Sequence, residues 1–212
     1  MISFETTHLV EAYREHCEDR LDIISDGNRT LIVVADGAGG SGDGSIAADT
    51  VINETRSHYT AIDSSIGWSQ FLSQLDFRVS VGETTAVIVD VHPDRILGAS
   101  VGDSRAWVID GPNVIDLTRT QNRKPLLGSR EAKPAPFWHG PLAGILLVGS
   151  DGFFGYAKRD QVTPLIARTD FHAIPKACID LVRLPSGDLW DDTAIVACRL
   201  RRPRSPRKRY TI

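Results

Sequence analysis

Four aspartates stand directly beside apolar segments of the sequence, an uncommon place for a charge. They are Asp36, Asp103, Asp151 and Asp191, and three of them are next to glycine. A carboxylate at the rim of a buried sheet is costly to desolvate unless a cation or a hydrogen-bond donor compensates it. Only Asp103 has a basic residue, Arg105, in its own turn. The other three therefore indicate a divalent metal, and oxygen ligands favour Mg²⁺, Mn²⁺ or Ca²⁺ over zinc.

The segment 30–40 presents the clearest of these carboxylates. Residues 30–35 are apolar or β-branched without alternation, which is typical of a strand covered on both faces, and Asp36 follows at its end. Glycines at 37, 39 and 40 permit positive φ angles and a close backbone approach. The Gly37 carbonyl and the Asp36 carboxylate can therefore face one ion. Taken alone, the segment also fits an Asp-Gly turn that closes a hairpin.

Paired ions in such a site would act on phosphate esters. Two ions about 4 Å apart, bridged by one aspartate and a water, would supply a hydroxide for in-line attack on phosphorus. Arg14 can hold phosphate oxygens through its planar guanidinium group. It belongs to a charged patch with Glu18 and Asp19, and a solvated surface cluster is the alternative interpretation of that patch.

Strands in hairpin succession are expected to position these residues. Turn formers at 25–28 predict that strands 21–24 and 30–35 pair antiparallel, so that Asp19 and Asp36 start and end neighbouring strands. The other predicted strands cover residues 84–91, 95–101, 105–109, 142–148 and 193–198. Residues 118–140 scatter proline and glycine among polar residues and predict an irregular connection.

Two groups of helices interrupt the strands. The first group covers about 46–59, with Ser45 as N-cap, and about 68–79. The second group consists of helices opening at Thr163-Pro164 and at Pro175, since proline is tolerated in a first turn. Strands and helices do not alternate as in a parallel sheet. We therefore expect an α+β fold of two antiparallel sheets packed face to face with helices outside.

The length and composition predict one cytoplasmic domain. The chain has 212 residues, 42% of them hydrophobic, and we expect a single domain over 1–200 and a basic, disordered tail over 201–212. We expect no membrane span, because no apolar run approaches the roughly 20 residues needed, and the first residues do not resemble a signal peptide. The three cysteines have no metal-site spacing and are expected to be buried. Outside the tail the chain is acidic, which argues against nucleic acid as the main partner.

Six short motifs in a fixed order together resemble the metal-dependent protein phosphatases of type 2C, especially compact bacterial members. The motifs span residues 14 to 194: Arg14-x-x-x-Glu18-Asp19, Val34-Ala35-Asp36-Gly37-Ala38-Gly39-Gly40, Gly82-Glu83-Thr84-Thr85-Ala86, Val101-Gly102-Asp103-Ser104-Arg105, Gly149-Ser150-Asp151-Gly152 and Asp191-Asp192-Thr193-Ala194. The resemblance implies a four-layer αββα sandwich with a centre of two Mn²⁺ or Mg²⁺ ions. It also implies a serine/threonine phosphatase, expected to be a monomer acting on a phosphorylated protein.

The resemblance also implies a role for each site residue. Asp36 would bridge the two ions, and the Gly37 carbonyl would bind the second. Asp151 and Asp191 would bind the first, and Asp103 a weaker third ion. Glu18 and Asp19 would orient the attacking water, while Arg14 would hold the substrate phosphate.

Two alternatives stay open at this point. One is a phosphatase that acts on a single small regulatory phosphoprotein in a partner switch, and the other is a pseudophosphatase that only binds. The chain also departs from the family in four places. Cys17 stands where bacterial members often have Asn, and position 192 is Asp where many eukaryotic members have Asn. The segment 117–121 lacks the Asp-His that often follows Leu-Thr, and the connection 118–140 is short for a full substrate-side flap.

Overall fold

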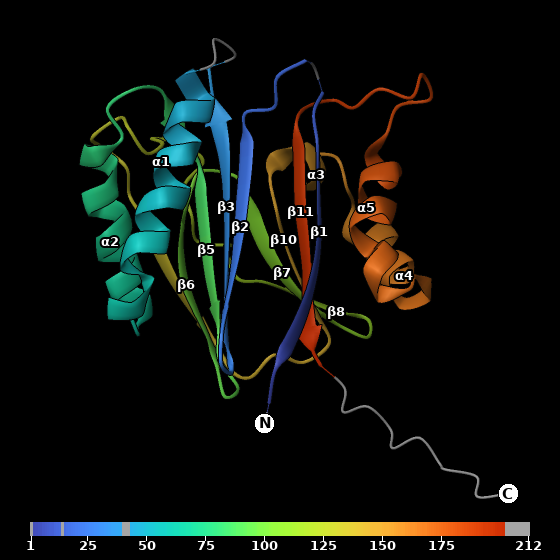
Figure 1. The fold of residues 1–212 in the computed structure, drawn as a ribbon. Helices are drawn as coiled ribbons and strands as arrows, with labels where there is room; N and C mark the ends of the chain where they lie inside the picture. The colour runs from blue at the N-terminus through green and yellow to red at the C-terminus, as the bar shows by residue number, and fades with distance from the viewer. Residues whose placement is uncertain (1, 14, 40–42, 202–212) are drawn as a thin grey trace, which may run out of the picture.

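The computed structural model describes residues 2–13, 15–39 and 43–201, and within them two antiparallel sheets pack face to face (Figure 1). The first sheet has the order β1 (Phe4–Glu11), β11 (Thr193–Leu200), β10 (Ile145–Gly149), β7 (Arg105–Asp110), β8 (Asn113–Asp116). The second has the order β2 (Asp19–Asp26), β3 (Arg29–Ala38), β5 (Ala86–Val91), β6 (Ile96–Val101), β9 (Ala135–His139), and the short β4 (Glu83–Thr84) pairs with β3. The expectation of two antiparallel sheets is confirmed.

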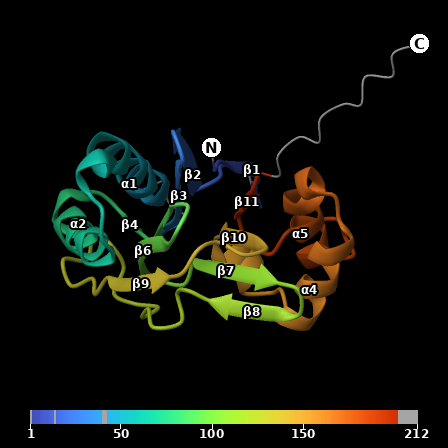
Figure 2. The same cartoon turned by 90° about the horizontal axis from the view of Figure 1, so that it is seen from below.

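Helices cover the outer face of each sheet. They are α1 (Asp43–His58) and α2 (Ser65–Arg78) on the second sheet, and α3 (Asp151–Phe154), α4 (Arg159–Arg168) and α5 (Ile174–Val182) on the first, with single 3₁₀ turns at Tyr59–Ala61 and Phe171–Ala173. Viewed from below, Figure 2 shows α1 and α2 on one side of the strands and α4 and α5 on the other. The order of layers is therefore helix, sheet, sheet, helix.

The position of β3 between two apolar layers explains why its sequence does not alternate between apolar and polar residues. Leu31 and Val33 face the helices α1 and α2, while Ile32 and Val34 face the other sheet, and all four are buried. Successive side chains of a strand point to opposite faces, so a strand between two apolar layers needs apolar residues at every position. The prediction that this segment is covered on both faces is confirmed.

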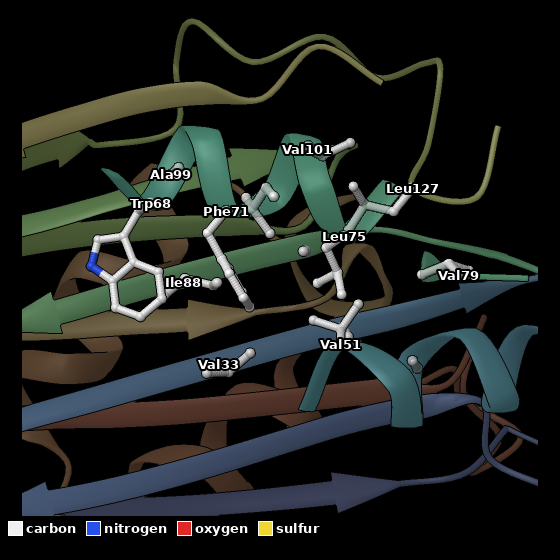
Figure 3. Close-up of a cluster of buried hydrophobic side chains, with 14 of the residues drawn as sticks. Val33, Val51, Trp68, Phe71, Leu75, Val79, Ile88, Ala99, Val101 and Leu127 are labelled. Carbon is white, nitrogen blue, oxygen red and sulfur yellow. The ribbon is translucent and has the colours of Figure 1, made fainter. Parts of the chain in front are cut away.

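The layer between the second sheet and its helices is held by large side chains from α2 (Figure 3). Trp68 and Leu75 are fully buried against Val33 and Ile88, and the Trp68 ring meets Phe71 edge-to-face at 5.8 Å. Burying each such side chain contributes roughly 1.5–3 kcal/mol. This packing fixes the end of β3, where Asp36 lies, relative to the start of α1.

Three strands were missed by the sequence analysis. Strands β1 and β9 are edge strands, and β8 is the other edge of the first sheet. An edge strand buries little of its side-chain surface, so the polar residues of β1 and β8 did not produce a recognisable alternation. Strand β9 lies inside the supposedly irregular connection 118–140, so that prediction is wrong for residues 135–139.

The predicted helices exist but several begin elsewhere. Helix α1 begins at Asp43, so Ser45 lies inside its first turn and is not the N-cap. Helix α2 begins at Ser65, and its N-cap is Ser64, whose hydroxyl accepts from the Gly67 N–H at 3.0 Å. Helix α4 begins at Arg159, and Pro164 lies in its interior rather than in its first turn. That proline is on the exposed face of the helix, away from the packed layer.

The remaining expectations concern small features. Cys178 and Cys198 are buried as predicted, whereas Cys17 is only half-buried, and all three are free thiols. None of the described helices is long and apolar enough to cross a membrane. Residues 202–212 of the predicted tail lie outside the described residues.

Candidate active site

The start of β2 and the end of β3 bring two carboxylates together. Asp19 pairs with Asp36 in the register of the antiparallel hairpin, as the sequence predicted. Figure 1 shows the end of β3 and the start of β11 at the same end of the two sheets, so the two sheets contribute to one site.

The backbone of Asp36 is fixed by two threonines. Its carbonyl oxygen accepts from the Thr84 hydroxyl and from the Thr85 N–H, both at 2.9 Å, and its N–H donates to the Thr85 hydroxyl at 3.1 Å. The Thr85 hydroxyl is also 2.7 Å from that of Ser104. The sequence analysis quoted the segment 82–86 without assigning it a role, and the structure shows that it anchors Asp36.

Glycine is required after Asp36 because the start of α1 lies against the strand. A Cβ atom added to Gly37 would lie 2.4 Å from the backbone of Gly44, and one added to Gly44 would lie 2.7 Å from the Gly37 carbonyl carbon. Positive φ, the reason expected from the sequence, applies here to Gly39, whose φ is 142°, and not to Gly37. The close approach sets the position of the Gly37 peptide beside the Asp36 carboxylate.

The first sheet contributes two further segments to the site, one that carries Asp151 and one that carries Asp191. Asp151 begins α3 directly after β10, and Asp191 lies two residues before β11. The Ser150 hydroxyl accepts from the Ala194 N–H at 2.9 Å, and a Cβ on Gly152 would lie 2.0 Å from the Asp192 carbonyl oxygen. These contacts hold the Asp151 and Asp191 segments against each other.

The carboxylates repel one another strongly. Burial raises the pKa of Asp36 well above its usual range, and the charges of Asp19, Asp151 and Asp191 raise it further. Burial followed by the charges of Asp103 and Asp191 raises the pKa of Asp151. Groups that interact in this way are stabilised together by a cation placed between them.

Asp19 adds a further buried carboxylate to the cluster. Its side chain is 3% exposed, and neither carboxylate oxygen has a hydrogen-bond partner among the described residues. Burial raises the pKa of Asp19 to about 7, and the charges of Asp192, Asp151 and Asp191 add to that rise. The nearby Ser150 hydroxyl offsets part of it, although it is not in hydrogen-bonding geometry with either Asp19 oxygen. A buried carboxylate without a donor indicates that a group outside the chain stabilises it.

All the residues expected from the sequence to bind metal line one cavity of about 300 Å³: Asp36, Gly37, Asp103, Asp151 and Asp191, together with Glu18. Every donor in this set is an oxygen, which suits Mg²⁺ or Mn²⁺. In the described parts of the chain, no three acidic, histidine or cysteine side chains already converge tightly enough to hold an ion. The donor set and the uncompensated Asp19 nevertheless fit a divalent cation.

Arg105, the basic residue in the turn of Asp103, does not pair with it. Arg105 points to Asp116, with 3.6 Å between the nearest nitrogen and oxygen, whereas Asp103 accepts from Arg123 Nε at 2.6 Å. Arg123 is twenty residues from Asp103 along the chain, so the local sequence carried no signal for this ion pair. The Asp103 carboxylate therefore lines the candidate metal cavity and is at the same time paired with a positively charged side chain, Arg123.

Asp192 is a site residue to which the sequence analysis gave no role. Its two carboxylate oxygens accept from the Tyr13 N–H at 2.7 Å and from the Glu18 N–H at 2.6 Å. These bonds fix both ends of the β1–β2 connection, which includes position 14. Arg14 itself lies outside the described residues. The doubled aspartate at 191–192 was the only sequence signal for this contact.

No protein-family model and no curated protein matches the chain. Solved structures do match over almost the full length. The S. agalactiae serine/threonine phosphatase has a TM-score of 0.78 and 17% identity, over 92% of this chain and 98% of that one. The chain has the fold of bacterial serine/threonine phosphatases.

Other phosphatase structures extend this likeness. Serine/threonine phosphatase Stp1 from Staphylococcus aureus has a TM-score of 0.76 and 20% identity, over 95% of this chain and 96% of that one. The catalytic domain of the serine threonine protein phosphatase PstP, in complex with two manganese ions, has a TM-score of 0.71 and 17% identity, over 94% of this chain and 99% of that one. The expected four-layer sandwich of the phosphatase family is confirmed.

Proposed function

We propose that this protein is a metal-dependent phosphatase that removes phosphate from phosphoserine or phosphothreonine in proteins. The observation that carries the proposal is the cavity lined by Asp36, Asp103, Asp151 and Asp191. Asp19, opposite Asp36 in the hairpin, is buried beside these residues, and its carboxylate oxygens accept no hydrogen bond from the described residues. The fold shared with bacterial serine/threonine phosphatases supports the choice of substrate.

In this proposal, two Mn²⁺ or Mg²⁺ ions are held by Asp36, the Gly37 carbonyl, Asp151 and Asp191, with Asp103 at a weaker third position. The PstP structure with two manganese ions supports the number and kind of ions. When bound, the ions supply charge that lowers the pKa of a water and offsets the charge of the phosphate.

The chain's own residues orient the reactants. The backbone of Asp36 is held by hydrogen bonds with Thr84 and Thr85, which fixes the point on β3 from which its carboxylate extends. Glu18 and Asp19 lie beside it and are proposed to accept the hydrogen bonds of the attacking water. Arg14 is proposed to hold the phosphate oxygens, because a guanidinium group binds two of them at once.

Asp192 completes the arrangement as a positioning residue. It accepts from the backbone on both sides of position 14 while standing next to the proposed ligand Asp191. The phosphate-binding connection and the metal site are therefore tied to each other by one side chain. Displacing either would move the other.

A direct test is hydrolysis of a phosphothreonine peptide by the full chain with Mn²⁺, Mg²⁺ or Ca²⁺, and with excess chelator after dialysis. We expect turnover with Mn²⁺ or Mg²⁺ and none with chelator. Asp36→Asn should be inactive, whereas Asp94→Asn, an exposed aspartate paired with Arg95 on the β5–β6 turn, should match the parent. Full turnover in chelator, or no turnover with any of the ions, would contradict the proposal.

A further inference from the structure

A second cavity adjoins the carboxylate cavity and has a volume of about 490 Å³. The two cavities share Asp103, Arg123 and Asp151 in their walls. The second cavity is also lined by Arg105 and Asp116 at the ends of β7 and β8, by the segment that follows β8, which includes Arg119, and by Tyr156 just after α3. A peptide whose phosphate lies in the first cavity has its neighbouring residues beside the second.

The arginines that line this cavity are Arg105, Arg119 and Arg123, and two of them are paired with aspartates of the same lining. Arg105 and Arg159 both point to Asp116, at 3.6 and 3.4 Å, and the side chain of Asp116 is 8% exposed. Arg123 is paired with Asp103. Of Arg105 and Arg159 only Arg105 lines the cavity, whose wall holds three arginines and the three aspartates Asp103, Asp116 and Asp151.

Arg119 is the arginine of this lining that is open to a ligand. It is exposed, it lines the cavity, and it makes no hydrogen bond or ion pair with any other residue that the structure describes. The segment that holds it is fixed at both ends. Thr118 donates its hydroxyl and its N–H to Asp116 Oδ1 at 2.8 and 3.0 Å, and Gln121 donates to the Ser104 carbonyl at 2.7 Å. The guanidinium group is thus available while its backbone is held.

Tyr156, which lines the cavity, belongs to a flat aromatic surface beside it. The rings of Tyr156 and Trp190 stack with their centroids 5.1 Å apart and their planes 8° from parallel. Both remain largely exposed, at 44% and 50%. Trp190 directly precedes Asp191, so this surface lies against the proposed metal site. A stacked pair of this kind covers an extended peptide with little loss of side-chain entropy.

We propose that the second cavity binds the peptide next to the phosphorylated residue and selects substrates with an anionic group there, with Arg119 as the specificity-determining residue. This inference rests on the proposed phosphatase function. The anionic group is a carboxylate or a second phosphate, since Arg119 would bind either through paired hydrogen bonds. The stacked rings hold the peptide backbone in place, and Arg119 binds the anionic group of the residue next to the phosphorylated one.

The test uses phosphothreonine peptides of one sequence that differ only in the residues beside the phosphothreonine. One has neutral neighbours, one has glutamate before it, one has glutamate after it, and one carries a second phosphothreonine. We expect the parent to favour at least one anionic peptide over the neutral one by about five- to tenfold in kcat/KM. The glutamate and bisphosphorylated peptides separate a carboxylate from a phosphate as the group recognised.

Three variants show whether Arg119 is responsible. Arg119→Ala should bring the ratio between the anionic and neutral peptides to about one, and Arg119→Glu should invert it, because like charges repel. Arg95→Ala removes another arginine that is partly exposed, on the β5–β6 turn, and should keep the parent's ratio. High salt should reduce the parent's preference, since the contact is exposed.

Two outcomes overturn the inference and leave the proposed function intact: a parent that turns over all four peptides equally, or an Arg119→Ala variant that keeps the parent's ratio. Failure of the proposed function looks different. In that case the parent with Mn²⁺ would not hydrolyse any of the peptides, nor p-nitrophenyl phosphate, which is too small to reach the second cavity.

Discussion

Replacing Asp19 with asparagine should stabilise the metal-free protein at alkaline pH. The folded-state pKa of Asp19 is raised from 3.8 to about 7, chiefly by burial. A carboxyl group whose pKa is raised on folding contributes stability that is fully present below the unfolded value and is lost as pH rises through the folded value. The metal-free protein therefore becomes less stable between about pH 4 and pH 7.

The size of the effect follows from the shift. The rise in the pKa of Asp19 from 3.8 to about 7 corresponds to about 4 kcal/mol in the free energy of unfolding. About 3 kcal/mol of this stability is lost between pH 5 and pH 8. The raised pKa values of Asp36 and Asp151 act in the same direction. Asp19→Asn removes the charge but leaves a buried amide without a partner, at a cost of about 1–3 kcal/mol. The variant should thus be about 1–3 kcal/mol more stable than the parent at pH 8.

Urea unfolding in excess chelator at pH 5 and pH 8 measures these differences. Asp22→Asn is the matched control on the same strand, because Asp22 is paired with Arg56 at 2.7 Å and its loss should destabilise by up to about 1 kcal/mol. Saturating Mn²⁺ at pH 8 should restore the parent, by about 3 kcal/mol at a hundredfold excess over the dissociation constant. The reasoning fails if the metal-free parent is equally stable at both pH values, or if Asp19→Asn destabilises it at pH 8 as the control does.

Four further predictions concern the roles of individual residues. Asp36→Asn should abolish tight binding of two Mn²⁺ ions in calorimetry and slow turnover by several orders of magnitude. Asp103→Asn should keep the two tight sites and raise the Mn²⁺ concentration needed for turnover. The reverse ranking of the two variants would refute the assignment of the ligands. Arg14→Ala should raise KM for a phosphopeptide without changing Mn²⁺ affinity, and unchanged kinetics would assign Arg14 to surface charge. Asp192→Ala leaves two backbone N–H groups without an acceptor, so it should raise KM, with circular dichroism confirming the fold; parent-like kinetics would remove it from the site. Truncation after Leu200 should leave turnover of a small phosphoester intact, and its loss in a folded protein would give the tail a role.

The strand ends and the acidic residues on them were predictable from the sequence. The run before Asp36 is apolar at every position because β3 is buried on both faces, and the hairpin that sets Asp19 opposite Asp36 is closed by a local turn. Helix starts were less predictable. Asp43 opens α1 because Gly44 packs against the Gly37 backbone, a contact that no propensity of Ser45 reveals.

Edge strands and the contacts between distant segments required the tertiary structure. Strand β1 is polar in sequence and is a strand because β11, almost two hundred residues away, supplies its hydrogen bonds. Asp103 faces Arg123, and Asp192 holds the backbone of Tyr13 and Glu18, across separations that leave no periodic signal. The sequence by itself determined which residues are acidic at strand ends, because burial and turn chemistry act locally. Only the packing of the two sheets decided which of them share a cavity and which donors they meet, because those contacts join residues that are neighbours in space and not in the chain.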